Sequence, residues 1–516
     1  MNRFVAKHAE KIIGVLSGFD RMLFRGTLRE ISYAGGMAKF LSIARVLRKN
    51  FGAFCDKATK RLREASLSAA ENLGRPALYL PGGSVDKEAM ARRIAEDDRI
   101  EKGLVCVLKA VEACRSYRVV HVGGENRFEL RLVPRKCLHL YHYMIDPLFG
   151  FMHARLQTWF PFNLQICLNG REWLGRAMDK AGIGYDRLDN CFTSIDGLDK
   201  AQKLADRQVR TRWESHLNRI AKQVNPGLSD ILGRFRSEYY WSLLQSEWAT
   251  DIMFDDPAGL ASIYTPLVRH GITTFSSGDV MRFLGGKVHG CFRGQIVSDF
   301  KNRPEGIRVK HRVNHNSVKL YDKQGSILRI ETTVNQPSGF KVFRHKQGDP
   351  NGEKAWRKMR QGISDLPRRA EVSQKSNERY LDALAAADTS TTLAQALESI
   401  LDPVPWKKTR VRGLRPWSRE DLHLLQQVTR GEFYINGFRN KDIRPLLFGD
   451  IPSDPIEAKR ASRRTTRLIR LLRAHRLVRK IPRTHRYMPT AKVREITSLL
   501  LATRDLTSEQ INQIAA

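Results

Sequence analysis

The sequence predicts an α/β (α+β) core with a mixed or antiparallel sheet, followed by a smaller C-terminal unit of different composition. Valine-rich and alternating runs at residues 103–133 and 294–344 are typical of strands, and stretches of helical period separate them. Prolines and basic residues at 391–417 indicate a linker. We therefore expect an N-terminal α/β region at 1–135, an α/β core at 136–390, this basic linker, a C-terminal domain at 418–490 and a helical tail at 491–516.

The charge balance of the chain points to a polyanionic partner. Its 516 residues include 89 Lys and Arg against 54 Asp and Glu, which gives a formal net charge of +35. Such an excess favours nucleic acid over an anionic membrane surface. No uncharged apolar run is long enough for a membrane span or a secretory signal, and the seven cysteines are scattered without a C-x-x-C pair. We expect a cytoplasmic protein with free thiols and no membrane partner.

The first 180 residues alternate patterns of both kinds. Glycines punctuate helical-looking stretches in residues 1–75, and a turn of Gly123, Gly124, Glu125 and Asn126 closes an expected hairpin. The expected strands are 76–83, 117–122, 127–133, 151–158 and 163–168, and a helix is expected from Asn169 to about Gly182.

Residues 138–174 are dense in aromatic side chains, with Arg155 and Arg171 between them. Two interpretations stay open. A sheet of this composition can stack unpaired bases and pair phosphates, as single-strand binders do. Aromatic residues also favour strands and cores for packing alone, which is the simpler interpretation.

Two carboxylates suggest a cation site in the middle of the chain. Residues 201–224 and 238–251 have helical patterns, and the second places Glu247 and Asp251, four residues apart, on one face. Trp241 and Trp248 nearby indicate partial burial, where two carboxylates would need a cation. The alternative is ordinary exposed charge.

A second polar cluster is expected on a strand pair. Residues 309–323 and 327–334 read as two strands joined by a turn. Alternation places Lys319, Tyr321 and Lys323 on one face of the first strand, and Arg329, Glu331 and Thr333 on one face of the second. These faces are either solvated or line a site. If Mg²⁺ or Mn²⁺ is used, its ligands are expected from Glu247, Asp251, Asp322 and Glu331.

The run Lys319-Leu320-Tyr321-Asp322-Lys323 followed by Leu328-Arg329-Ile330-Glu331 resembles the strand pair of replication initiators from rolling-circle plasmids and filamentous phages. In that family carboxylates help to hold a metal and a tyrosine cleaves one DNA strand. The resemblance therefore implies a nucleophilic Tyr321 and metal-holding Asp322 and Glu331. In such a mechanism we expect Lys323 and Arg329 to stabilise the charge of the phosphorane.

The same family often carries a His-hydrophobic-His strand, and this chain has His139-Leu140-Tyr141-His142 instead. The extra residue puts the two imidazoles on opposite strand faces. Cys137 with His139 and His142 is a Cys/His cluster, but no second ligand pair follows at zinc-finger spacing, which disfavours structural zinc.

Helix signals are most consistent at the C-terminus. Ser418 begins a capping box, Asn440 precedes a short helix, and Asp454-Pro455 opens a third helix with Glu457 at its third position. The third helix has an aliphatic face and an arginine face, and residues 477–481 and 485–488 form an expected basic hairpin. Residues 403–490 hold 22 Lys and Arg against 7 Asp and Glu, more than solubility requires.

Three helices followed by such a hairpin resemble a winged helix-turn-helix domain. In that family the third helix enters the major groove and the wing contacts the backbone or the minor groove. The implied DNA-binding residues are Arg460, Arg463, Arg464, Arg467 and Arg470 on the helix and Arg483, His485 and Arg486 on the wing.

The whole chain also resembles uncharacterised bacterial proteins carried by mobile elements. We expect a DNA-processing protein, a replication-initiator-like or transposase-like metal-dependent nuclease, with duplex DNA ahead of RNA or single-stranded DNA as partner. One alternative is a non-catalytic winged-helix regulator that binds an operator. The other is an RNA-binding protein that uses the aromatic sheet.

Overall fold

The computed structural model describes most of the chain. Described are residues 2–81, 85–123, 127–286, 294–303, 306–346, 348–349, 351–385, 393–407, 409–430, 433, 437–449, 454–482, 484–490, 492–493, 496–497 and 500. Among these, no helix has both the length and the apolar character that a membrane span needs.

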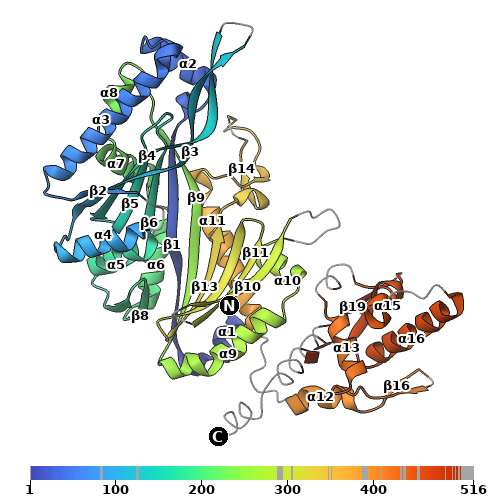
Figure 1. Cartoon of the computed structure of the whole chain (residues 1–516). Helices are drawn as coiled ribbons and strands as arrows, with labels where there is room; N and C mark the ends of the chain where they lie inside the picture. The colour runs from blue at the N-terminus through green and yellow to red at the C-terminus, as the bar shows by residue number, and fades with distance from the viewer. Residues whose placement is uncertain are drawn as a thin grey trace. The chain divides into compact units, whose positions relative to one another are not determined.

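A mixed sheet of eleven strands dominates the fold, in agreement with the expected α/β class (Figure 1). Its order is β10-β11-β12-β13-β9-β1-β6-β5-β4-β3-β2. β2 is parallel to β3, whereas β3, β4, β5, β6 and β1 pair antiparallel in turn. The strands are β1 Ile12–Leu28, β2 Ala77–Leu80, β3 Gly103–Val122, β4 Arg127–Asp146, β5 Gly150–Gln157, β6 Leu164–Asn169, β9 Tyr239–Phe254, β10 Ile296–Arg303, β11 Gly306–Val313, β12 Asn316–Lys323 and β13 Ile327–Val334.

The chain divides into two compact units. Unit 1 comprises Met1–Ile12, Phe254–Ile330 and Ser376–Ala516, and unit 2 comprises Ile13–Met253 and Glu331–Lys375. This division differs from the expected boundaries, and residue 135 lies inside β4, which pairs with β3 along its whole length.

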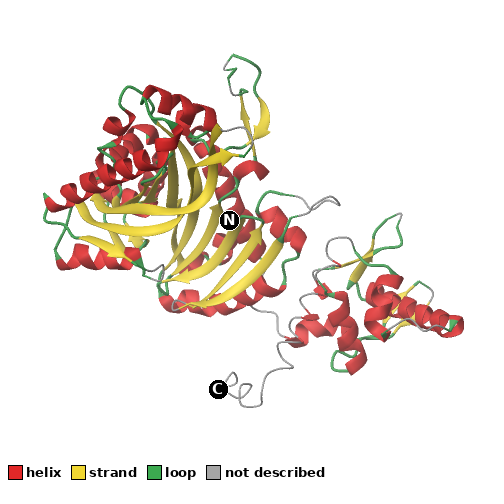
Figure 2. Ribbon diagram, turned by 45° about the horizontal axis from the view of Figure 1, so that its top comes forward, coloured by secondary structure: helices red, strands yellow, loops and turns green. Residues whose placement is uncertain are grey.

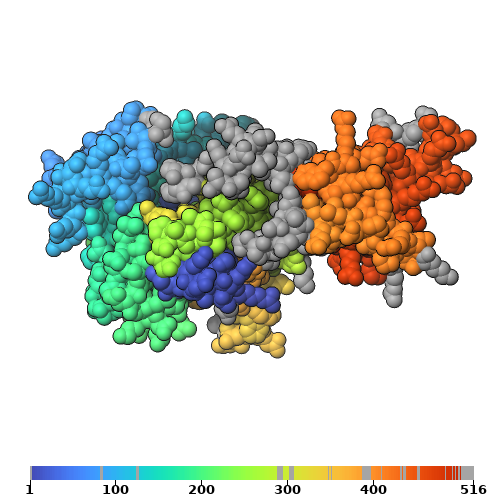
Figure 3. All heavy atoms as spheres, turned by 90° about the horizontal axis from the view of Figure 1, so that it is seen from below, coloured from blue at the N-terminus to red at the C-terminus, as the bar shows by residue number. Residues whose placement is uncertain are grey.

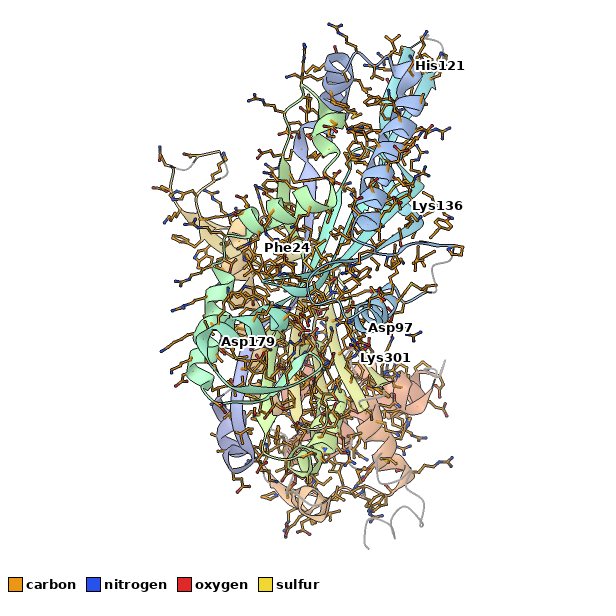
Figure 4. All side chains as sticks on the ribbon, turned by 90° about the vertical axis from the view of Figure 1, so that its left-hand side faces the viewer. Phe24, Asp97, His121, Lys136, Asp179 and Lys301 are labelled. Atoms are coloured by element: carbon orange, nitrogen blue, oxygen red, sulfur yellow. The ribbon has the colours of Figure 1, made fainter. Side chains whose placement is uncertain are left out.

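In unit 2 the sheet has two unlike faces. One face packs Phe24, Leu140 and Ile166 against helices α2 (Ala34–Ile43), α3 (Phe51–Glu71) and α7 (Trp213–Val224), forming the largest core cluster. Figure 2 shows these helices lying along the strands, and Figure 4 marks Phe24 within the unit and His121 near the end of the long β3–β4 hairpin. The opposite face carries polar side chains over β1, β6 and β5, and over β4 it carries Tyr141 and Tyr143, which belong to a second apolar cluster.

Further elements of unit 2 flank the sheet. They are α4 Lys87–Asp97, α5 Gly170–Ala181, α6 Leu198–Val209, α8 Leu228–Leu232, the hairpin β7 Tyr185–Leu188 and β8 Cys191–Ile195, and the hairpin β14 Lys341–Arg344 and β15 Ala355–Lys358. Helix α11, Leu366–Leu384, begins in this unit, where Trp248 Nε1 donates a hydrogen bond of 2.8 Å to Gln374 Oε1.

Several expected strands are confirmed and other assignments are wrong. The predicted hairpin is the β3–β4 pair, although its turn residues 124–126 lie outside the described residues. Residues 12–28 and 239–254 are strands, not helices. The expected strand 309–323 is two strands, β11 and β12, and the expected helix 201–224 is α6 and α7.

Unit 1 includes α1 (Asn2–Lys7), α9 (Pro257–Thr273) and α10 (Ser277–Phe283) beside β10, β11 and β12. The N-terminal segment lies against α9, where Lys11 Nζ donates to Ser262 Oγ at 3.2 Å (Figure 3). His311 of β11 is fully buried and contacts Ser298 Oγ at 2.8 Å and Tyr380 Oη at 3.0 Å.

The C-terminal part has a core of its own. Its elements are α12 Leu393–Leu401, β16 Val404–Trp406, β17 Thr409–Val411, α13 Arg419–Val428, α15 Asn440–Phe448, α16 Pro455–Ala474, β18 Val478–Lys480 and β19 Tyr487–Pro489. Ile400, Val411 and Leu414 pack in the same core cluster as Leu425 and Leu472. The described residues of 393–407 and 409–417 are therefore part of a folded body instead of a plain linker.

Two of the three expected helix starts are confirmed there, whereas α15 begins at Asn440 itself, which donates to the Ser462 carbonyl instead of capping the helix. Ser418 Oγ accepts from the Asp421 N–H at 3.2 Å, and Asp454 Oδ1 accepts from the Ile456 N–H at 3.0 Å. After α16, β18 pairs antiparallel with β19, and Phe438, between α13 and α15, forms a bridge to Tyr487.

Candidate metal centre and nucleic-acid surface

Three carboxylates from three strands converge in unit 2. Asp20 lies on β1, Glu247 on β9 and Glu331 on β13, and one oxygen of each lies within 4.8 Å of the others. These strands are consecutive in the sheet order. Asp20 and Glu331 are buried and Glu247 is half-buried. Such a set of oxygens is what a hard divalent cation such as Mg²⁺ or Mn²⁺ takes as ligands.

A neutral donor holds one oxygen of each carboxylate. Asn190 Nδ2 donates to Asp20 Oδ1 at 2.6 Å, and Gln245 Nε2 donates to Glu247 Oε1 at 2.9 Å. Thr333 Oγ1 donates to Glu331 Oε1 at 3.3 Å. Amide and hydroxyl donors orient a carboxylate without neutralising it, and ligating carboxylates in metal sites are commonly held in this way.

The N-terminus of α5 supports the Asp20 side of the cluster. Asn169 caps this helix by accepting from the N–H groups of Arg171 and Glu172, and its Nδ2 donates to Asn190 Oδ1 at 2.8 Å. The first helical residue is Gly170, where an added Cβ would lie 2.1 Å from the Phe19 carbonyl oxygen. Only glycine lets the helix approach β1 this closely beside Asp20.

Arg21 is the cation next to the cluster on β1. Its side chain donates from Nε to Cys167 Sγ at 3.2 Å. The Cys167 thiol, and to a smaller extent the charge of Glu247, raise the pKa of Arg21. The residue is exposed, so its guanidinium can meet a phosphate near the carboxylates.

The polar face of the unit 2 sheet continues away from Arg21. Arg25 on β1 lies opposite Gln165 on β6, which lies opposite Arg155 on β5. Arg155 Nη1 donates to Gln165 Oε1 at 3.1 Å. We name Arg21, Arg25, Arg155 and Gln165 the polar sheet face. Of the two arginines expected in residues 138–174, Arg155 lies on this side of the sheet, whereas Arg171 is buried on α5. Leu140, Leu156 and Ile166 fill the core on the other side.

The predicted metal set is only partly brought together. Glu247 and Glu331 meet, whereas Asp20, which the sequence reasoning did not select, completes the cluster. Because β9 is a strand, Glu247 and Asp251 are about 13 Å apart along it and do not share a cation. Asp251 instead forms an ion pair of 2.9 Å with Arg171, and both side chains are only 1% exposed.

The predicted strand-pair residues lie in several environments. All eight residues of β13 are buried, which includes Arg329 and Glu331, so this face is not a solvated one. Tyr321, Asp322 and Lys323 are half-buried at the end of β12. Asp322 Oδ1 accepts from the Gly325 N–H at 2.9 Å in the turn that follows, and burial raises the pKa of this carboxyl group. Asp322 does not belong to the carboxylate cluster.

The two histidines of β4 point to different surroundings. His139 is held by its Nδ1 at 3.1 Å from the Cys137 carbonyl oxygen, and His142 by its Nε2 at 3.1 Å from Ser66 Oγ. Burial lowers the pKa of His142 to about 4. The expectation that their spacing separates the two imidazoles is confirmed.

The arginine face of α16 is exposed. Arg460, Arg463, Arg464, Arg467 and Arg470 all lie on the solvent side, while Thr465, Ile469 and Leu472 are buried. Arg464 contacts Glu420 at 3.3 Å and the Phe448 ring. In the hairpin His485 is exposed and Arg486 is half-buried, with its Nη1 donating to the Gly437 carbonyl, while Arg483 lies outside the described residues.

Comparison with family models, with curated proteins and with solved structures finds no match to this chain.

Proposed function

We propose that this protein cleaves phosphodiester bonds of DNA with a divalent metal held by Asp20, Glu247 and Glu331. The convergence of these three oxygens within 4.8 Å carries the proposal. The chain has a net charge of +35, so a buried group of three acids is more readily explained by metal binding than by a need to balance charge over the surface.

The chemistry of the centre follows from its ligands. A bound Mg²⁺ or Mn²⁺ would polarise a phosphoryl oxygen and lower the pKa of a coordinated water. With such an ion held by the three carboxylates, the oxygen of that water would bond to phosphorus while the P–O bond to the leaving sugar oxygen breaks, and a proton given up by the water would end on the leaving oxygen as a sugar hydroxyl. Arg21 contributes by binding a non-bridging oxygen of the same phosphate.

The polar sheet face supports binding of a nucleic-acid strand next to the cluster. Arg21 and Arg25 offer guanidinium groups on β1, and Arg155 on β5, which is also paired with Glu112, adds another across β6. Such groups pair with successive phosphates independently of base sequence.

The C-terminal part supplies a second basic surface, which we propose to be a winged helix-turn-helix domain. The order helix, bridging residue, two helices and hairpin supports this assignment, with α13, Phe438, α15, α16 and the β18–β19 pair. In this proposal the exposed arginines of α16 enter the major groove and His485 and Arg486 contact the backbone. Replication initiators and transposases of mobile elements both select and cut DNA. We therefore propose that this protein is encoded by a mobile element.

A cleavage assay tests the proposal. Purified full-length protein is incubated with labelled single-stranded DNA, duplex DNA and RNA in Mg²⁺, Mn²⁺ or EDTA. We expect metal-dependent cleavage of DNA that EDTA abolishes. If the protein forms a covalent adduct with DNA and the Tyr321→Phe variant does not, Tyr321 is the nucleophile in place of water.

A non-catalytic regulator is the second candidate, and the exposed arginine face of α16 favours it independently of the acidic cluster. It predicts binding to a defined duplex sequence without cleavage in any metal. Bound-fraction sequencing in the same reactions distinguishes the two candidates.

A further inference from the structure

A second cluster of metal-ligand residues lies in unit 2, on β3 and β4. Cys114, Cys137 and His139 each place one ligand atom within 4.8 Å of the others. The Cys114 and Cys137 sulfur atoms are 2.8 Å apart. Cys137 and His139 are buried, and Cys114 is half-buried.

The strand register explains why these three side chains share one face. Residues two apart on β4 point the same way, so Cys137 and His139 are neighbours. On β3, Glu112 is opposite Cys137 and Cys114 is opposite Arg135, which places Cys114 diagonally beside Cys137. His142, which stands with Cys137 and His139 in the sequence, points to the other face and contacts Ser66.

His139 is arranged as metal ligands usually are. Its Nδ1 lies 3.1 Å from the Cys137 carbonyl oxygen. With the proton on Nδ1, this contact is a hydrogen bond, and Nε2 keeps its lone pair for a cation. A ring N–H given to a backbone carbonyl fixes the tautomer and the ring orientation of ligating histidines.

We propose that Cys114, Cys137 and His139 bind one Zn²⁺ ion, with a water molecule as the fourth ligand. Two thiolates and one imidazole are soft and borderline ligands that select Zn²⁺ over Mg²⁺ or Mn²⁺. In a tetrahedral site with bonds of about 2.0–2.3 Å, ligand atoms lie roughly 3.5–3.8 Å apart, so small side-chain movements complete the coordination.

The surroundings provide room for the fourth ligand. Cys114 and His139 line a cavity of about 220 Å³ together with Arg25, Arg115 and Arg155. Two thiolates neutralise the two charges of Zn²⁺, so the bound centre is neutral and is not repelled by these arginines. Arg155 is itself paired with Glu112 at 2.6 Å.

Cobalt substitution tests this site separately from the carboxylate cluster. Full-length protein, reduced and freed of metal, is titrated with Co²⁺ and then with Zn²⁺. Only sulfur ligands give the near-ultraviolet thiolate-to-cobalt charge-transfer band, and tetrahedral geometry gives strong visible bands. We expect both, at one equivalent per chain, and displacement by Zn²⁺.

Matched variants assign the ligands. Cys114→Ser and His139→Asn are expected to weaken Zn²⁺ binding by roughly 100-fold or more, with circular dichroism showing that the fold is kept. Cys106→Ser, on the same face of β3 but packed among apolar side chains, should leave the cobalt spectrum unchanged. Glu331→Gln should also leave it unchanged, so failure of the zinc site and failure of the proposed nuclease centre are distinguishable.

Three results would overturn the zinc proposal. One is the absence of a charge-transfer band in reduced protein. Another is a band that survives Cys114→Ser. The third is a protein isolated lighter by two hydrogen atoms, with Cys114 and Cys137 joined in one peptide pair, which would make the pair a disulfide.

Discussion

At the residue scale, the carboxylate cluster depends on neutral side chains that hold each acid in place. Asn190 is the clearest example, because it connects Asp20 to the cap of α5 through Asn169. It does not belong to the ligand set itself, so it acts by positioning.

Asn190→Ala is therefore expected to lower cleavage at limiting Mg²⁺ by about 10- to 100-fold, because Asp20 loses its orientation. Raising the Mg²⁺ concentration should restore most of the rate, which a loss of folding would not allow. The measurement is the metal dependence of the cleavage rate, with Asn72→Ala at the end of α3 as a control. An unchanged metal dependence would remove Asn190 from the centre.

The Arg171–Asp251 pair is expected to be structural. Asp251→Ala leaves a buried guanidinium without its carboxylate and should lower the free energy of unfolding by about 3–5 kcal/mol. Asp230→Ala, which removes an exposed ion pair with Arg61, should cost less than about 1 kcal/mol. Urea unfolding measures both. Equal effects would contradict the assignment of Asp251 to the core.

His311 gives unit 1 a dependence on pH. Burial lowers its pKa from 6.5 to about 4, so the folded protein holds it neutral while the unfolded chain takes up a proton below pH 6.5. Its contribution to stability is thus complete above pH 6.5 and is lost as the pH falls towards 4. Between pH 7 and pH 5 the loss is about 2 kcal/mol.

Urea unfolding of wild type and His311→Gln at pH 7 and pH 5 checks this expectation. The variant should be less stable at pH 7, but its stability should fall less between the two pH values. A parallel decline in both proteins would show that other groups cause the pH dependence.

At the element scale, the buried central strands were the hardest to predict. β9 has Trp241, Leu244, Trp248 and Ile252 at helical spacing, and its last seven residues are all buried. A strand covered on both faces loses the polar alternation that identifies strands, so its pattern cannot be told from a helix. In β1 residues 16–20 are likewise all buried, although burial alternates in the rest of the strand.

The edges and hairpins were predicted because their signals are local. The β3–β4 hairpin and the strands β5 and β6 followed from alternation and turn residues, and the starts of α5, α13 and α16 followed from capping residues.

The limits of local sequence patterns also explain why only part of the carboxylate cluster was predicted. Glu331 was selected from its own strand, whereas its meeting with Asp20 and Glu247 depends on strand order in the sheet, which no local pattern contains. Asp20 stands as a single acid among apolar residues such as Phe19 and Met22, and this isolation was the sequence feature that could have marked it as a ligand.

Helix α16 is expected to contact phosphates or base edges through its exposed arginines. Arg463→Ala and Arg467→Ala should each weaken duplex binding, and each lost phosphate contact should lower the slope of log K against log salt by about 1. Fluorescence anisotropy at several salt concentrations measures this. Arg92→Ala on α4 is the matched control. An equally large loss of duplex binding in this control would contradict the assignment of DNA contacts to α16.

At the scale of the whole molecule, two basic surfaces are expected to have separate roles, one in selecting DNA and one in holding it for cleavage. The arginines of α16 would select a duplex and those of the polar sheet face would hold a strand beside the carboxylate cluster. Loss of α16 arginines should therefore change which DNA is bound more than it changes the cleavage of DNA supplied at saturating concentration.

The most direct test of the account is a comparison of Asp20→Asn, Glu247→Gln and Glu331→Gln with the exposed-site control Asp230→Asn. Mn²⁺ binding by electron paramagnetic resonance and cleavage of labelled DNA are measured on the same folded samples. The account predicts that each of the three variants loses tight Mn²⁺ binding and roughly 100-fold or more in cleavage rate, while the control keeps both. Undiminished cleavage by all three variants, or no cleavage by the wild type with Mg²⁺ or Mn²⁺, would contradict it.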